Sequence, residues 1–141
     1  MSRALSPKSY IRKAESALSG ARVLLQSGDS DGACSRAYYA MFDAAHAALF
    51  ALRAEDFAAP IKTHNGLVAR FGQHVVATGQ LAAEHGSDLN KVQNLRQLAD
   101  YSGEPVDIDK AAWAVERAEA FVAAVKGKFE PPRPPNGRAT V

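Results

Sequence analysis

The segment SRAYYAMFDAAHAALF at residues 35–50 decides the fold, because it reads as one helix that is apolar almost all the way round. At about 100° of rotation per residue, its polar side chains fall within roughly one quarter of the circumference. This polar stripe consists of Ser35, Arg36, Tyr39, Asp43 and His46. Such a helix is buried, and its polar members are costly to bury unless each finds a partner. The stripe is therefore expected to form an internal hydrogen-bonded network or to lie at a seam between two copies of the chain.

The composition indicates one globular domain. The chain has 141 residues, of which 47% are hydrophobic and 23% are charged, and this length can bury a substantial core. No apolar run reaches the roughly 18–20 residues of a membrane span, and the N-terminus lacks the apolar block of a secretory signal. We therefore expect a cytoplasmic protein. A net charge of +2 is too small to indicate nucleic-acid binding by itself, but it leaves room for a local basic groove.

The cysteine and histidine content argues against a metal centre. Cys34 is the only cysteine, so an internal disulfide is excluded, and its place on the apolar side of the 35–50 helix predicts a core residue. The chain contains no CxxC motif and no clustered Cys/His pattern. We expect neither a metal site nor a cofactor.

Helical periodicity and capping residues predict five helices. The first starts at Pro7 and ends at Ser27-Gly28, and the second runs to about Arg53. A third follows Pro60 and ends near Thr78-Gly79, and residues 81–86 form a connector. The fourth is capped by Ser87 or Asp88 and stops at Ser102-Gly103; the last is capped by Asp107 or Asp109 and reaches Phe129. These elements predict an all-α, largely antiparallel bundle of four long helices plus a shorter one over residues 1–129. Four prolines within residues 130–141 predict a disordered tail.

Arg96 is the second unusual position. It shares one helix face with Leu89, Val92 and Ala99, where a core residue is expected. A guanidinium in an apolar seam needs carboxylates, carbonyls or a phosphate for its five donors. Asp100 is four residues further on, but the order Arg before Asp is the weaker one for such a pair. A salt bridge to Asp100 therefore does not fully explain Arg96.

Three segments resemble the HEPN-domain family, of the small stand-alone prokaryotic kind. They are SRAYYAMF at 35–42, KTHNGLVARFGQHVVATG at 62–79 and LRQLADY at 95–101. The similarity covers roughly residues 5–129. It implies a helical bundle that dimerises around a shared groove. It also implies a metal-independent ribonuclease motif, in which an Arg is followed by a polar residue and then by a His. Many members pair with a minimal nucleotidyltransferase that acts as the antitoxin.

On this resemblance Arg96 matches the motif arginine and Gln97 the polar position. Tyr101 stands where the histidine is expected, and a phenol with an ordinary pKa of about 10 is a poor base at pH 7. Arg96 would then bind a phosphate, Tyr101 would assist, and Asp100 would hold Arg96. The resemblance also allows Arg36 to face the groove.

Three further histidine and tyrosine positions have open alternatives. His64, with Lys62, opens the third helix, where a positive dipole end favours anions, although surface solvation is the default explanation of the pair. Tyr39, Asp43 and His46 are spaced for a hydrogen-bonded network, and His46 could also replace the absent motif histidine in space.

Two functions of different class remain. The first is a toxin-like homodimer that cleaves RNA without a metal and is neutralised by a nucleotidyltransferase. The second is a non-catalytic module that binds a nucleotide or RNA, or docks a partner. The missing histidine favours the second function, and the segments shared with the family favour the first.

Overall fold

A computed structural model describes residues 6–52 and 63–129, and all regular elements in these two ranges are helical. The long helices are α1 (Pro7–Gln26), α2 (Ser30–Ala51), α4 (Ala83–Ser102) and α5 (Ile108–Phe129). Helix α3 (His64–Phe71) is short and continues into the π-helical turn η1 (Gly72–Val76). The expected all-α bundle of four long helices plus a shorter one is confirmed. Arg53, Lys62 and the Pro-rich tail at 130–141 lie outside the described residues.

Side-chain caps set where most of the helices begin. At α1, Ser6 accepts a hydrogen bond from the backbone of Ser9, and the Ser9 hydroxyl accepts one from the backbone of Ser6. Asp29 caps α2 and Thr63 caps α3. Asp107 accepts from the Asp109 backbone N–H at 2.8 Å, at the start of α5. These polar side chains satisfy amide groups that have no partner inside the helix.

The expected start of the fourth helix was wrong. Helix α4 begins at Ala83, within the segment predicted as a connector, and its N-cap residue Ala82 provides no side-chain hydrogen bond. Asp88 is not a cap: it is buried, and its carboxylate lies 3.5 Å from the Arg117 guanidinium of α5. The carboxylate that resembled a capping signal is used for a contact between helices.

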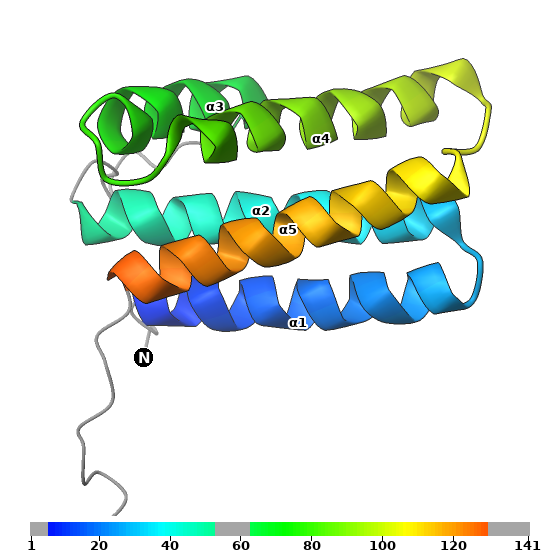
Figure 1. The fold of residues 1–141 in the computed structure, drawn as a ribbon, viewed down its shortest axis with the longest axis horizontal. Coiled ribbons are helices and arrows are strands. Elements are labelled where there is room, and N and C mark those ends of the chain that lie inside the picture. Colours follow the sequence, from blue (N-terminus) through cyan, green and yellow to red (C-terminus); the bar gives the residue numbers. More distant parts are fainter. Residues whose placement is uncertain (1–5, 53–62, 130–141) are drawn as a thin grey trace, which may run out of the picture.

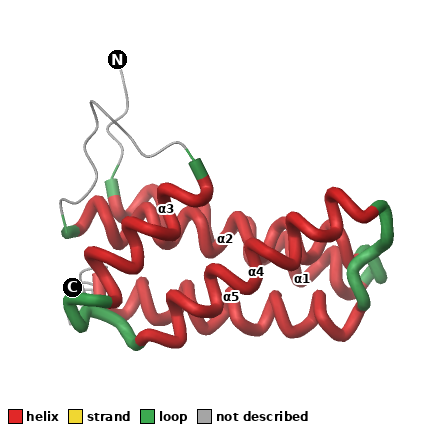
Figure 2. Tube along the Cα trace, turned by 90° about the horizontal axis from the view of Figure 1, so that it is seen from above, coloured by secondary structure: helices red, strands yellow, loops and turns green. Residues whose placement is uncertain are grey.

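Helix α2 lies at the centre of the bundle and contacts α1, α3, α4 and α5 (Figure 1). Successive long helices run in opposite directions, and the α1–α2 and α4–α5 loops lie at the same end of the bundle (Figure 1 and Figure 2). The α1–α2 and α4–α5 loops meet at one end, where the Val106 N–H donates to the Asp31 carboxylate at 2.7 Å. In the part of the chain that the structure describes, no helix is long and apolar enough to cross a bilayer.

Candidate functional site

The Arg96 side chain of α4 lies against two aromatic rings of α2. Its guanidinium carbon is 5.0 Å from the ring centroid of Tyr38 and 5.7 Å from that of Tyr39. The Arg96 side chain is 14% exposed. A planar, weakly hydrated guanidinium is suited to this place, because aromatic faces attract it and leave its N–H groups free for other partners.

The hydrogen-bonding capacity of this guanidinium is only partly used. Its Nη1 donates to Asp100 Oδ2 at 3.0 Å, and the Asp100 side chain is 58% exposed. Its Nε is buried and has no hydrogen-bond partner among the described residues. One exposed carboxylate does not saturate five donors. The Arg96 guanidinium therefore keeps donor capacity that no described residue uses.

His64 lies on the other side of Tyr38. It is the first residue of α3, and its Nδ1 is 2.7 Å from the Tyr38 hydroxyl oxygen. Burial raises the pKa of the Tyr38 phenol, so this group keeps its proton. Burial lowers the pKa of His64, and the Arg96 charge lowers it further. The His64 imidazole is therefore neutral at pH 7.

A second hydrogen bond joins α4 to the first turn of α3. Gln93 is buried, and its side-chain amide donates to Asn65 Oδ1 at 3.1 Å. The Gln93 carbonyl oxygen is buried without a partner among the described residues. Gln93 and Arg96 are three residues apart on α4 and thus lie near each other on its surface. We call Tyr38, Tyr39, His64, Gln93 and Arg96 the Arg96 cluster.

The side chains of the polar stripe of α2 face two different helices, α4 and α1. Tyr39 lies at Arg96, whereas the Arg36 guanidinium lies against Gly20 of α1. The His46 ring is buried and stacks on Tyr10 of α1 at a centroid distance of 5.1 Å.

Asp43 and His46 form the part of the stripe that faces α1. Burial raises the pKa of Asp43, and the charges of Lys13, His46 and Arg36 oppose this rise. The His46 ring also contacts Phe42 at a centroid distance of 4.8 Å. This half of the stripe lies toward α1, where the ring contacts of His46 are with Tyr10 and Phe42, whereas Tyr39 belongs to the Arg96 cluster.

Comparison with known proteins places the chain in a family. Residues 7–128 match the HEPN domain. The chain belongs to the HEPN domain family. A Gloeobacter violaceus protein, "UPF0332 protein glr0978", is 41% identical over 91 residues, which are 64% of this chain and 68% of that one. A Methanocaldococcus jannaschii protein named "Putative toxin MJ0605" is 32% identical over 119 residues, which are 84% of this chain and 85% of that one.

In this HEPN chain Tyr101 and Arg96 lie on different sides of α4. Tyr101 is 86% exposed near the end of α4. It follows Arg96 by five residues, which corresponds to about 140° around the helix. The structure therefore brings His64, but not Tyr101, to the Tyr38 side of Arg96. Lys62, predicted beside His64, lies outside the described residues.

Sequence reasoning missed Tyr38, Gln93 and Asn65 at the candidate site of this HEPN chain. Tyr38 falls outside the polar quarter of α2 and was counted with the apolar side chains. Its hydroxyl was the available signal, because a buried tyrosine hydroxyl usually needs a hydrogen-bond partner. No signal in the sequence pointed to the Gln93–Asn65 contact, since it depends on how α3 is placed against α4.

Proposed function

We propose that this HEPN protein is a toxin-like protein that acts on RNA, with Arg96 binding a backbone phosphate. The observation that carries the proposal is the incompletely paired guanidinium held on Tyr38 and Tyr39. Guanidinium groups favour phosphate because their N–H fork matches two of its oxygens. Relatives named as toxins, from Methanocaldococcus jannaschii, support the toxin-like role.

The proposed reaction is metal-independent RNA cleavage. The ribose 2′ oxygen forms a bond to phosphorus while the bond to the 5′ oxygen breaks, which gives a cyclic phosphate and a 5′-hydroxyl. Arg96 stabilises the charge on the phosphate oxygens. The 2′-hydroxyl proton passes to Nε2 of neutral His64 and then through solvent to the 5′ oxygen. Asp100 holds the guanidinium, and Tyr101 contacts the RNA strand from the exposed end of α4.

A non-catalytic binding module is the second candidate. The tautomer of His64 distinguishes it from a protein that cleaves RNA. Cleavage needs the tautomer in which Nδ1–H donates to the Tyr38 oxygen and Nε2 is free to accept a proton. In the other tautomer the Tyr38 hydroxyl donates to Nδ1, and Nε2–H is a neutral donor suited only to binding. The position of Tyr101, where the family motif has histidine, favours this second candidate.

Cleavage and binding of a labelled RNA, both measured in EDTA, test the proposal. We expect the wild-type protein to cleave, and Arg96→Ala to lose about 10²-fold or more of that activity. His64→Gln should lose cleavage but keep binding. Arg12→Ala, which removes an exposed arginine of α1, is the matched control and should behave as wild type.

The other outcomes are equally informative. RNA binding that needs Arg96, without any cleavage, would establish the binding module. RNA binding and cleavage that are both unaffected by Arg96→Ala would show that the proposed site is wrong. Circular dichroism of each variant separates a lost site from a lost fold.

We also propose that two copies form a homodimer around the Arg96 cluster and that a minimal nucleotidyltransferase neutralises the protein. The family resemblance and the toxin names of the relatives support both parts. Light scattering of the purified chain measures the first part. Co-purification with the product of a neighbouring nucleotidyltransferase gene measures the second, and RNA cleavage that persists in that complex would contradict neutralisation.

A further inference from the structure

Exposed apolar side chains gather where α4 ends and α5 begins. Among the described residues, the large hydrophobic side chains with high exposure include Leu98 at 66%, Tyr101 at 86% and Ile108 at 47%. Two other exposed side chains, Val23 and Tyr39, lie elsewhere, on α1 and α2. Contiguous apolar surface is a common mark of a binding site, whereas single exposed side chains are normal.

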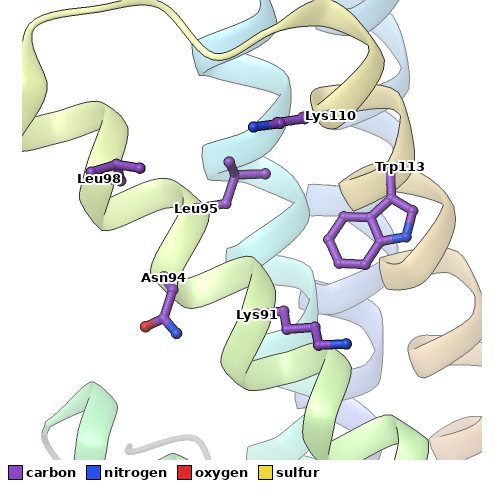
Figure 3. A pocket seen from close by; sticks show the side chains of 6 residues that line it. All are labelled: Lys91, Asn94, Leu95, Leu98, Lys110 and Trp113. Atoms are coloured by element: carbon purple, nitrogen blue, oxygen red, sulfur yellow. The ribbon is translucent and has the colours of Figure 1, made fainter.

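One of these side chains, Leu98, lines a groove between α4 and α5. Its main hollow has a volume of about 450 Å³ and is lined by Lys91, Asn94, Leu95, Leu98, Lys110 and Trp113 (Figure 3). A second hollow of about 190 Å³ shares Leu95, Leu98 and Lys110, extends to the α4–α5 loop and is also lined by the carboxylates of Glu104 and Asp107. We call the main hollow, whose lining has two lysines and no carboxylate, the α4–α5 groove.

This groove is separate from the Arg96 cluster. The four α4 residues of the main hollow lie within an arc of about 100° on the helix, whereas Arg96 lies about 100° beyond the nearest of them. Arg96 faces α2, as its contacts with Tyr38 and Tyr39 show. An occupant of the groove would therefore contact α4 on a face that the proposed phosphate site does not use.

The charge of the main hollow points to an acidic occupant. Lys91 comes from α4 and Lys110 from α5, and Leu95 and Trp113 lie between them (Figure 3). No carboxylate lines this hollow. Within residues 6–52 and 63–129, the ion pairs join Arg22 to Glu119, Arg96 to Asp100, Arg117 to Asp88 and Lys126 to Glu15, so both lysines are available to a ligand.

We propose that the α4–α5 groove docks an acidic amphipathic helix of a partner protein. Its apolar side chains would pack on Leu95, Leu98 and Trp113, and carboxylates at its edges would pair with Lys91 and Lys110. A helix fits because two neighbouring helices form a long groove that accepts apolar side chains spaced three or four residues apart. The proposal goes beyond the reaction at Arg96 and does not depend on it.

Trp113 makes this proposal directly measurable. It is the only tryptophan of the chain, so the protein's tryptophan emission reports on this groove alone. The probe is a synthetic helical peptide of about 15 residues, which spans about four turns. It carries leucines on one face and glutamates on both edges, and it has no tyrosine or tryptophan. We expect a saturable blue shift of the Trp113 emission during titration of the full chain.

Three variants separate specific docking from adhesion to apolar surface. Leu98→Asp should weaken the peptide by about tenfold or more, as for a central contact of an interface. Val23→Asp makes the same change at a side chain of α1 that is 64% exposed, and should leave the affinity unchanged. Lys91→Glu combined with Lys110→Glu should weaken the acidic peptide and favour a peptide with lysines in place of the glutamates.

The proposal is overturned by any of three results. The first is equal binding of the acidic and basic peptides to the wild-type chain. The second is an emission shift of the same size with decanoate, an acidic amphiphile without a helix, which would identify a small-molecule pocket. The third is self-association of the chain that Leu98→Asp abolishes and that the peptide cannot displace, which would make a second copy the occupant.

Discussion

Tyr38 connects the two polar groups of the candidate site through one side chain. Its ring lies against the Arg96 guanidinium, and its hydroxyl contacts His64 Nδ1 at 2.7 Å. The sequence singled out Arg96, because a cation on an apolar helix face is unusual and therefore visible. Tyr38 could not be recognised in the same way, since a tyrosine on such a face fits an ordinary core. Its role depends on α3, whose place against α2 has no local signal.

Arg96→Gln should raise the pKa of His64. Burial and the Arg96 charge both lower that pKa, so removing the charge leaves only the effect of burial. NMR of the imidazole Cε1–H during a pH titration measures the change. Arg12→Gln removes an exposed charge of α1 and serves as the control. An unchanged pKa in Arg96→Gln would show that the guanidinium does not act on His64.

Asp43→Asn should be more stable than the wild-type protein at pH 7, and this difference in stability should become smaller at low pH. In the unfolded chain Asp43 ionises near its ordinary pKa of 3.8, whereas burial raises its pKa in the folded protein. Between these two values the folded state holds the extra proton, so the wild-type protein loses stability as the pH rises through this interval. The asparagine variant avoids that loss. Thermal melts should show a higher Tm for the variant at pH 7 and a smaller difference below pH 3.8.

A suitable control for this experiment is Glu116→Gln, which neutralises an exposed carboxylate of α5. Its melting temperature should follow that of the wild-type protein across the same pH range. If the difference in Tm between Asp43→Asn and the wild type does not depend on pH, ionisation of Asp43 is not the cause of that difference. The neighbouring charges of Lys13, His46 and Arg36 would then fully compensate for burial.

At the scale of helices, α2 is built from small side chains. Its buried alanines are Ala33, Ala37, Ala40, Ala44, Ala45, Ala47 and Ala48. A helix that contacts four others needs such residues, because they let neighbouring helices approach closely. This explains why so many of the buried positions of α2 are alanines.

Ala44→Leu should lower the free energy of unfolding by about 1–3 kcal/mol, since extra methylene groups in a packed core force side chains and backbone to shift. Ala44 is fully buried. Ala51→Leu makes the same change at the exposed last residue of α2 and should have little effect. Urea denaturation followed by circular dichroism measures both. Equal stability of Ala44→Leu and wild type would mean that α2 has free space around it.

The sequence predicted helices where local signals and packing agree, and it failed where they compete. Asp107, one of the two caps predicted for the last helix, accepts a hydrogen bond at the start of α5. Asp88 resembles a cap but pairs with Arg117, because a buried carboxylate needs a partner for its charge. The position of Asp88 in the sequence does not reveal that partner. The π-helical turn η1, Gly72–Val76, was not expected, since the third helix was predicted to continue without interruption.

At the scale of the whole molecule, α2 joins the other described helices into one bundle. It contacts every other helix in the described ranges, so its buried residues become accessible only when the bundle opens. Cys34 is such a residue: it is 1% exposed and lies near the start of α2. Burial, together with a smaller effect of the Asp31 carboxylate, raises the pKa of its thiol to about 11. The reactive thiolate is therefore scarce as well as covered.

Cys34 should consequently react with a thiol reagent only through unfolding of the whole bundle. A domain with a stability of 5 kcal/mol or more is unfolded less than about once in 10³ molecules, so labelling at pH 8 should be slower than in the unfolded chain by at least that factor. In increasing urea, the labelling rate should rise with the same midpoint as the loss of helical circular dichroism. Labelling well below that midpoint would mean that α2 becomes exposed by a partial opening, and the bundle would then not unfold as one unit.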